Sequence, residues 1–299
     1  MRLPGPDYAA PAKLNLFLRV VGRRADGYHL LQTAFIFLDY GDRLRFGVRS
    51  DGIIRRINEL AGVAPEDDLA VRAARLLQRA TGCSLGADIA VEKRLPLGGG
   101  LGGGSSDAAT TLLALNQLWQ TGLTRIELSK LAIQLGADVP VFIFGQSAFA
   151  EGVGDDLRAI DFPEFWYLVL TPPVAVSTKA IFSHANLTRD SIPLKIADFS
   201  AARTAWLPQV ARTANDLEPV VVAEYPQVAA SLSALRAVSR DSFFALQGRN
   251  ARMTGSGACV FAAFASENEA LEAKRRLPDT APGFVARGLQ RHPLFALSR

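Results

Sequence analysis

The sequence predicts an α+β protein of two domains. Its 299 residues are enough for two domains of ordinary size, and 49% hydrophobic with 21% charged residues is typical of globular chains. The early part of the chain is read as strands joined by short connections, which favours antiparallel pairing, and the second half combines strands and helices again. We expect an N-terminal domain over residues 1–160 and a C-terminal domain over residues 161–299.

The first predicted strand runs over Ala12–Val20. Apolar residues alternate with others along it, so that Lys13 and Asn15 share the face opposite the leucines. This alternation is typical of a half-buried strand whose other face meets water. A turn is expected over Gly22–Tyr28, because its Asp-Gly pair is a strong turn signal.

Two further strands are predicted over Thr33–Leu38 and Arg43–Val48, and the first helix follows them. Asp67 or Asp68 can cap this helix, and Gly82 follows its expected end. The order of strands first and helices next supports the α+β class.

A capping-box pattern marks another helix, in which Thr124 and Glu127 precede an apolar repeat and Gly136 stands at the expected end. The second half is expected to form strands at Trp166–Leu170, Ala258–Phe264 and Phe284–Ala286, a helix at Gln227–Val238, and a helix capped by Ser266 and Glu269 that ends near Leu277.

The most informative segment is Leu95–Asp107, LPLGGGLGGGSSD, in which six glycines occupy seven positions. A strand pattern around Ile89 and Val91 precedes it, and a helical pattern from Ala108 to Trp119 follows it. A strand, a glycine loop and a helix start in this order present backbone N–H groups to an anion, and the helix dipole adds to the attraction. The segment therefore predicts a phosphate-binding loop. The ordered elements on both sides argue against a flexible linker.

Two common nucleotide motifs do not fit this loop. No lysine follows the glycines as a Walker loop requires. The early antiparallel strands argue against the doubly wound sheet of dinucleotide-binding proteins.

Charge and cysteine content narrow the function further. The chain has 33 basic and 29 acidic residues, a net charge of +4 and a pI near 9.3, without a basic block. Phosphorylated small molecules are therefore better expected partners than nucleic acid.

No apolar run reaches the ~18 residues that span a bilayer. Residues 1–11 lack the apolar stretch of a signal peptide, and two distant cysteines build neither a disulfide framework nor a cysteine-rich metal site. We expect a cytoplasmic protein with no membrane association; nothing in the sequence specifies an oligomeric state.

Pro96–Ala108 resembles the ATP loop of the GHMP kinases, the family of galactokinase, homoserine kinase and mevalonate kinase. Further segments are similar to the branch that phosphorylates a cytidine-diphosphate-linked methylerythritol in the non-mevalonate route to isoprenoid precursors. The resemblance extends from about Pro11 to Phe264. These segments are PAKLNLFL at 11–18, DGYHLL at 26–31, GADVP at 136–140 and TGSGACVF at 254–261.

The resemblance implies a ribosomal protein S5-like N-terminal domain packed on a ferredoxin-like C-terminal domain, with the active site between them. It implies that ATP is the co-substrate, that Mg²⁺ accompanies it, and that the acceptor is an alcohol. The ATP-binding residues would be Pro96, Leu97, Gly98, Gly99, Gly100, Leu101, Gly102, Gly103, Gly104, Ser105 and Ser106.

The resemblance also assigns catalytic roles to Asp138 and Lys13. Asp138 would act as general base toward the attacking hydroxyl, and the positive charge of Lys13 would keep it ionised. From the residues alone, each has an ordinary alternative. Asp138 could simply cap a helix, and Lys13 could face water, as most strand lysines do.

The substrate-binding residues implied by the resemblance lie in several segments. Tyr28 and Phe182 would stack on the cytosine, and His29 would contact the base and its phosphates; each could instead be an ordinary surface or core residue. Thr171 is a weaker candidate, and Gly255 with Ser256 could form only a tight turn. The metal ligands are unknown, with Ser106 as a guess. The predicted substrate-binding residues are Asn15, Tyr28, His29, Thr171, Phe182, Gly255 and Ser256.

Two alternative functions stay open at this point. A GHMP kinase for homoserine or mevalonate would not need the aromatic pair Tyr28 and Phe182. A basic nucleic-acid-binding protein with an S5-like domain would bind oligonucleotides with a steep salt dependence and would not turn over ATP.

Overall fold

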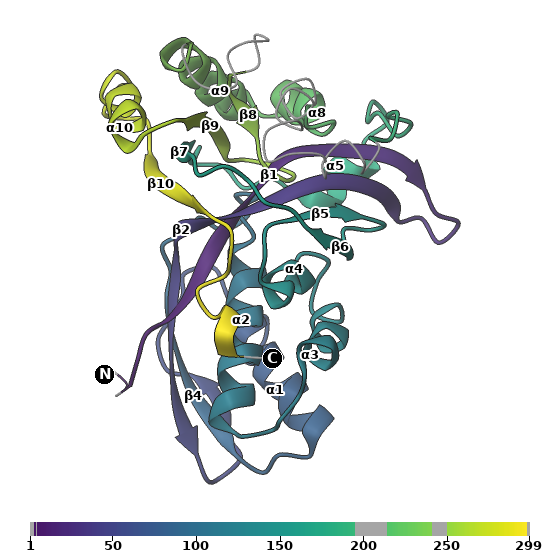
Figure 1. Ribbon diagram of the computed structural model, residues 1–299, viewed down its shortest axis with the longest axis vertical. Coiled ribbons are helices and arrows are strands. Elements are labelled where there is room, and N and C mark those ends of the chain that lie inside the picture. The colour runs from purple at the N-terminus through teal and green to yellow at the C-terminus, as the bar shows by residue number, and fades with distance from the viewer. Residues whose placement is uncertain (1–2, 4, 195–213, 241–249, 298–299) are drawn as a thin grey trace.

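The computed structural model describes residues 3, 5–194, 214–240 and 250–297. Its N-terminal half combines a sheet with four helices (Figure 1). The elements of this half are β1 (Tyr8–Arg23), β2 (His29–Arg49), β3 (Ile54–Arg56), α1 (Leu69–Thr81), β4 (Gly86–Glu92), α2 (Gly103–Leu118), α3 (Arg125–Ala132), α4 (Val139–Phe144), β5 (Ala148–Glu151) and β6 (Asp156–Ala159).

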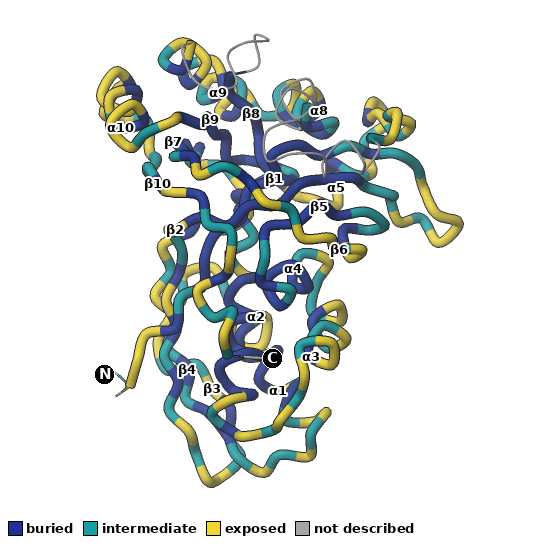
Figure 2. The backbone as a smooth tube through the Cα atoms, in the orientation of Figure 1, coloured by how far each residue is buried: buried dark blue, intermediate teal, exposed yellow. Residues whose placement is uncertain are grey.

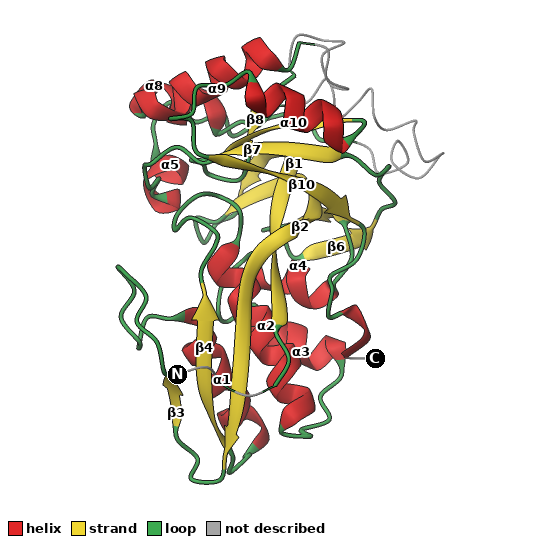
Figure 3. Cartoon of the chain, turned by 90° about the vertical axis from the view of Figure 1, so that its left-hand side faces the viewer, coloured by secondary structure: helices red, strands yellow, loops and turns green. Residues whose placement is uncertain are grey.

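The C-terminal half forms a second layered region, in which the helices labelled α8, α9 and α10 lie over the sheet (Figure 3). Its described elements are β7 (Trp166–Leu170), α5 (Thr178–Ser183), α8 (Glu218–Glu224), α9 (Pro226–Val238), β8 (Arg252–Met253), β9 (Val260–Phe264), α10 (Glu267–Arg275), β10 (Gly283–Leu289) and the short 3₁₀ helix η2 (Phe295–Leu297). Among the described residues, no helix is both long and apolar enough to cross a membrane.

One sheet connects the two halves. Its strands follow the order β3-β4-β2-β10-β7-β9-β8, while β1 pairs with β2 and β5 pairs with β2 and β6. The long strands β1 and β2 run antiparallel through both regions (Figure 1). The mixed α and β content confirms the predicted α+β class. The division near residue 160 stays a prediction.

The strand predicted over Ala12–Val20 is longer than expected and is buried on both faces. Lys13 and Asn15 are each only 2% exposed, and Phe17 is fully buried. The prediction of a water-facing polar side is therefore wrong. Figure 2 shows why: β1 passes through the middle of the molecule, with the chain packed around it.

The two strands predicted over Thr33–Leu38 and Arg43–Val48 are one continuous strand, β2. The residues between them stay paired with β1, with Gly41 opposite Pro11. A Cβ at Gly41 would lie 2.1 Å from the Ala10 carbonyl oxygen. Glycine thus lets the two strands approach closely at the position that the sequence suggested as a break.

The helix-end predictions are confirmed where they depend on local contacts. Asp68 caps α1 and accepts from the Ala70 N–H at 2.9 Å, and Gly82 ends the helix with φ +65°. Thr124 and Glu127 form the expected capping box of α3, and Ser266 caps α10. However, α3 ends at Ala132, ahead of Gly136.

Candidate active site

A cleft of about 490 Å³ lies where the glycine loop, β1 and α5 meet. It is lined by every residue predicted for the ATP loop except Ser106, that is, by Pro96 through Ser105. The structure brings six other predicted site residues to the same cleft: Lys13, Asn15, Asp138, Phe182, Gly255 and Ser256.

The glycine loop leads directly into α2. Gly98, Gly100 and Gly102 have φ values of +67°, +76° and +72°, a backbone region that favours glycine. Gly102 is the N-cap, and the first helical hydrogen bond runs from the Ser106 N–H to its carbonyl. Helices leave their first N–H groups without partners inside the helix, so the start of this helix offers donors to an anion in the cleft.

The helix begins earlier than the residues suggested. The helical pattern of the sequence begins at Ala108, but Ser105, Ser106 and Asp107 already lie inside the first turns of α2. The reason is the left-handed conformation of Gly102, which starts the helix without a side-chain cap.

The second glycine-rich turn packs against the loop, backbone to backbone. The Cys259 N–H donates to the Gly99 carbonyl at 3.0 Å. A Cβ at Gly100 would lie 2.3 Å from the Thr254 carbonyl oxygen. Asn215 holds the turn from behind, because its amide donates to the Met253 and Gly255 carbonyls. Packing of the glycine loop against the second turn therefore requires glycine at position 100. Close approach of a phosphate to the loop backbone would be a separate reason for glycine.

Lys13 and Asp138 form an ion pair in the cleft. The Lys13 Nζ lies 3.1 Å from the Asp138 Oδ2. The lysine side chain is 2% exposed, while the aspartate side chain is 40% exposed. Asp138 stands at the N-cap position of α4 but makes no side-chain capping bond. Its carboxylate therefore contacts the lysine and stays open to the cleft, where it can accept a proton.

Asn15 fixes the lysine of this pair. The Asn15 Oδ1 accepts from Lys13 Nζ at 2.5 Å, and its amide donates to Thr33 Oγ1 at 2.9 Å. The Asn15 N–H donates to Thr254 Oγ1, also at 2.9 Å. Lys13 is thus held between a carboxylate and an amide oxygen on a buried strand.

The residues predicted for base recognition are only partly together. Phe182 lines the cleft, and its ring centroid lies 5.1 Å from that of His29. Tyr28 belongs to the turn between β1 and β2, and 65% of it is exposed. Thr171 lines a different pocket, beside Tyr40. The structure therefore joins Phe182 with His29 and leaves Thr171 outside the cleft.

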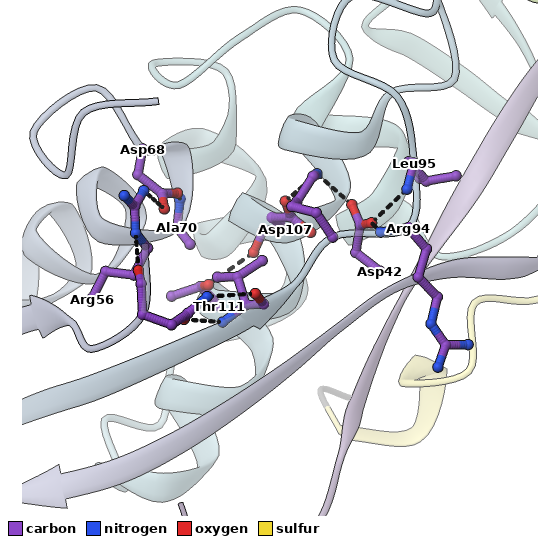
Figure 4. Close-up of polar contacts among 11 residues, drawn as sticks. Asp42, Arg56, Asp68, Ala70, Arg94, Leu95, Asp107 and Thr111 are labelled. Carbon is purple, nitrogen blue, oxygen red and sulfur yellow. Dashed lines mark hydrogen bonds and ion pairs between the residues drawn. The ribbon is translucent and has the colours of Figure 1, made fainter. Parts of the chain in front are cut away.

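A second group of charges was missed by the sequence analysis (Figure 4). Lys93, which lines the cleft, forms ion pairs with Asp42 and with Asp107, the latter at 2.9 Å. Asp42 also accepts from the Arg94 and Leu95 N–H groups at 2.6 and 2.8 Å. It therefore holds the chain where it enters the glycine loop. Burial raises the pKa of Asp107 to about 7, even though the charge of Lys93 lowers it.

The only sequence signal for this group was a lysine at the end of a strand next to the loop. Its partner Asp42 is 51 positions away, so no local pattern connects them. Figure 4 also shows Asp68, the cap of α1, bound to Arg56 at 2.8 Å.

No ready-made metal cage is found among the described residues, which contain no group of three or more His, Cys, Asp or Glu side chains placed to hold an ion. Two buried oxygens in the first turns of α2, Ser106 Oγ and Asp107 Oδ1, have no hydrogen-bond partner within the described part of the chain. These acceptors fit a hard cation that a phosphate group also binds.

Comparisons with known proteins agree with this geometry. The family model described as the GHMP kinases N terminal domain matches residues 68–146, and the one described as GHMP kinases C terminal matches residues 200–283. A homoserine kinase from Cytophaga hutchinsonii shares the fold, with a TM-score of 0.65 at 17% identity over 96% of this chain and 94% of that one. The fold is thus that of the GHMP kinases.

More similar proteins define the branch. A 4-diphosphocytidyl-2-C-methyl-D-erythritol kinase from Nitrosospira multiformis is 58% identical over 95% of this chain and 92% of its own. One from Aromatoleum aromaticum is 56% identical over 96% and 95%. A crystal structure of 4-(cytidine 5'-diphospho)-2C-methyl-D-erythritol kinase superposes with a TM-score of 0.78 at 33% identity, covering 95% of this chain and 99% of that chain. The chain belongs to the 4-diphosphocytidyl-2-C-methyl-D-erythritol kinase family.

Proposed function

We propose that this kinase transfers the γ-phosphoryl group of ATP to the 2-hydroxyl of 4-diphosphocytidyl-2-C-methyl-D-erythritol, in the non-mevalonate isoprenoid precursor pathway. The observation that carries the proposal is the open carboxylate of Asp138, held by buried Lys13 in the cleft that the glycine loop lines. The names of the relatives supply the substrate.

The ATP phosphates would lie on the glycine loop and the start of α2. Gly102, Gly103, Gly104 and Ser105 line the cleft there. Free N–H groups and the positive end of the helix dipole stabilise phosphate oxygens at such a position. Because phosphoryl transfer depends mainly on positioning and charge stabilisation, a rigid loop suits the reaction.

Asp138 would act as the general base. The substrate hydroxyl gives its proton to the carboxylate, its oxygen bonds to the γ-phosphorus, and the bond to the β,γ-bridging oxygen breaks to release ADP. Lys13 would stabilise the ionised carboxylate and orient it. The fixed partners of Lys13 on β1 support this role.

Mg²⁺ is the expected companion of ATP, and it would offset charge on the phosphates. Ser106 Oγ lies next to the loop and has no hydrogen-bond partner among the described residues, so it is the side-chain oxygen that would approach such an ion, although Ser106 is buried behind the cleft lining. Phosphate oxygens and waters usually provide most of its ligands.

The cytidine part of the substrate would occupy the end of the cleft at Phe182. The ring pair of Phe182 and His29 supports this placement, and the turn residue Tyr28 could close over a bound base, since its ring is exposed. Thr171 is less well supported, because it lines another pocket.

Free thiols at Cys83 and Cys259 agree with a cytoplasmic location.

A coupled assay of ADP release tests the proposal. The cytidine substrate, homoserine and mevalonate are offered to the same enzyme with ATP and Mg²⁺. We expect turnover with the cytidine substrate and at least about a hundredfold lower kcat/KM with the other alcohols, because they lack a base to stack. Equal turnover of homoserine or mevalonate would favour the alternative of another GHMP substrate.

A further inference from the structure

Arg189 joins two ring-bearing segments, that of Phe182, which lines the cleft, and that of His29. It is half-buried and lies beyond the end of α5. Its Nε donates to His29 Nε2 at 3.2 Å, across 160 positions of sequence. Its other nitrogens donate to the main-chain carbonyls of Leu187 at 3.0 Å, Phe182 at 3.2 Å and His184 at 2.7 Å. One guanidinium thus holds four acceptors.

These contacts fix both members of the ring pair. The carbonyl of Phe182 belongs to the last turn of α5, where carbonyls lack partners inside the helix. Arg189 satisfies it together with that of His184, while the fourth contact holds the His29 ring against Phe182 at an interplanar angle of 35°. The planar donor fork of arginine suits this task, and a lysine cannot reproduce it.

The contact also determines where the His29 ring carries its proton. Because Arg189 donates to Nε2, that nitrogen must be an acceptor, and a neutral imidazole then has its proton on Nδ1. Burial, followed by the positive charges of Arg189 and Arg23, lowers the pKa of His29. Among the described residues, the His29 side chain makes a hydrogen bond only through Nε2, and the ring is partly exposed, so the Nδ1 N–H can donate to a ligand that reaches it.

We propose that Arg189 is a positioning residue for base recognition: its guanidinium holds Phe182 and His29 together and sets the His29 tautomer with the proton on Nδ1. The ring pair then offers an aromatic face and one N–H donor, which can meet N3 or O2 of cytosine. The inference rests on the proposed function for the identity of the base. The geometry of the free protein does not depend on it.

Nitrogen NMR of the three histidines tests the tautomer without any substrate. His29→Gln identifies the His29 signals. In the parent protein above neutral pH, we expect His29 Nε2 to behave as an acceptor and Nδ1 to carry the proton. In Arg189→Gln and Arg189→Lys, the ring should change to a mixture of tautomers. Buried His292, which packs on Phe37 and Phe142, reports in the same spectrum that each variant is folded.

Arg24→Gln is the matched control. Arg24 lies in the turn before β2 and pairs with exposed Asp26 at 2.7 Å. The substitution removes one guanidinium from the turn that precedes His29, and this guanidinium pairs with Asp26 and not with His29. We expect the His29 spectrum and the kinetic constants of this variant to match those of the parent.

Kinetics test the consequence for recognition. Arg189→Gln should raise the KM for the cytidine substrate roughly tenfold, equivalent to about 1.4 kcal/mol, while the KM for ATP and kcat stay within about twofold. A parent-like His29 tautomer in Arg189→Gln, or an equal rise in both KM values, would overturn the positioning role. A parent enzyme that ignores the cytidine substrate would instead overturn the proposed function, and the NMR result would still decide whether Arg189 sets the tautomer.

Discussion

Two lysine–aspartate clusters lie on the same cleft, and they differ in which partner is buried. In the first, Lys13 is 2% exposed and Asp138 is 40% exposed. In the second, Lys93 is 17% exposed, while the Asp42 and Asp107 side chains are 0% and 5% exposed. The cation is thus hidden in one cluster, and the carboxylates are hidden in the other.

This difference in burial indicates which cluster can take part in catalysis and which one holds the glycine loop in place. A carboxylate can take a proton from a substrate only if the substrate can reach it, which Asp138 allows. Asp42 is buried away from the cleft. Its carboxylate oxygens bind Lys93 and accept hydrogen bonds from the N–H groups of Arg94 and Leu95. The first cluster is therefore suited to catalysis, and the second to holding the loop.

The largest expected effect is on the activity of Asp138→Asn. Losing a general base typically costs ~10²–10⁴ in rate, so kcat should fall at least about a hundredfold. The free energy of unfolding should fall by about 1–3 kcal/mol, because the buried Lys13 ammonium then has only neutral amide oxygens as partners. Steady-state ADP release and urea unfolding measure the two quantities. Near-parental turnover would show that Asp138 is not the base.

Replacing each lysine by methionine sharpens the comparison. Lys93→Met should lower the free energy of unfolding by about 3 kcal/mol, because it leaves buried carboxylates without their cation. Lys13→Met should cost about 1 kcal/mol or less, since the exposed Asp138 keeps its water, but it should lower kcat strongly. Urea unfolding measures the stability of both variants, and steady-state ADP release measures their kcat. Similar stability losses in the two variants would contradict the assignment of one cluster to catalysis and the other to holding the loop.

The loop between the clusters is probed by Gly104→Ala. Gly104 lies in the first turn of α2, and a Cβ there would meet only the flexible end of Leu69, at 3.3 Å. Stability should stay level or rise by up to about 1 kcal/mol, while the KM for ATP rises severalfold because the methyl group enters the phosphate site. Calorimetric ATP binding and a melting curve check both parts. Unchanged affinity would place the phosphates elsewhere.

The smallest effect concerns pH and Asp107. Its pKa is about 7 in the folded protein, above the ordinary carboxyl value of 3.8, because of burial. The folded state therefore keeps a proton that the unfolded chain loses, and stability falls as pH rises from about 4 to 7 and then levels off. Asp107→Asn lacks this dependence. Urea unfolding at several pH values should show the parent losing stability relative to the variant across that window.

A constant difference between the two proteins from pH 5 to 8 would contradict the raised pKa. Lys93 does not obscure the test, because its own pKa is raised from 10.5 and its titration lies above the window.

The fold and much of the site could be predicted because their signals are local. Asp68, Thr124 and Gly82 act within a few residues, so spacing alone indicates the helix ends. The glycine loop is likewise one continuous segment. The branch-specific segments then assigned Lys13 and Asp138, which the structure places 3.1 Å apart.

The remainder depends on contacts between distant segments. Both faces of β1 are covered by other parts of the chain, and Lys13 is therefore buried. The alternation of residue types within one strand does not reveal this packing. The continuity of β2 depends on pairing at Gly41, and the Asp42 contact to Leu95 spans 53 positions. Arg189 lies 160 positions from His29. No sequence spacing could have connected these partners.

The most direct test of the catalytic cluster is a double-mutant cycle on kcat with Lys13→Met, Asp138→Asn and both together. Groups that act as one unit are far from additive in their effects. If Lys13 works only through Asp138, the double variant should be within about threefold of Asp138→Asn alone. If the two losses multiply, to ~10⁴ or more when each is about a hundredfold, Lys13 and Asp138 act independently and the shared role proposed for them is wrong.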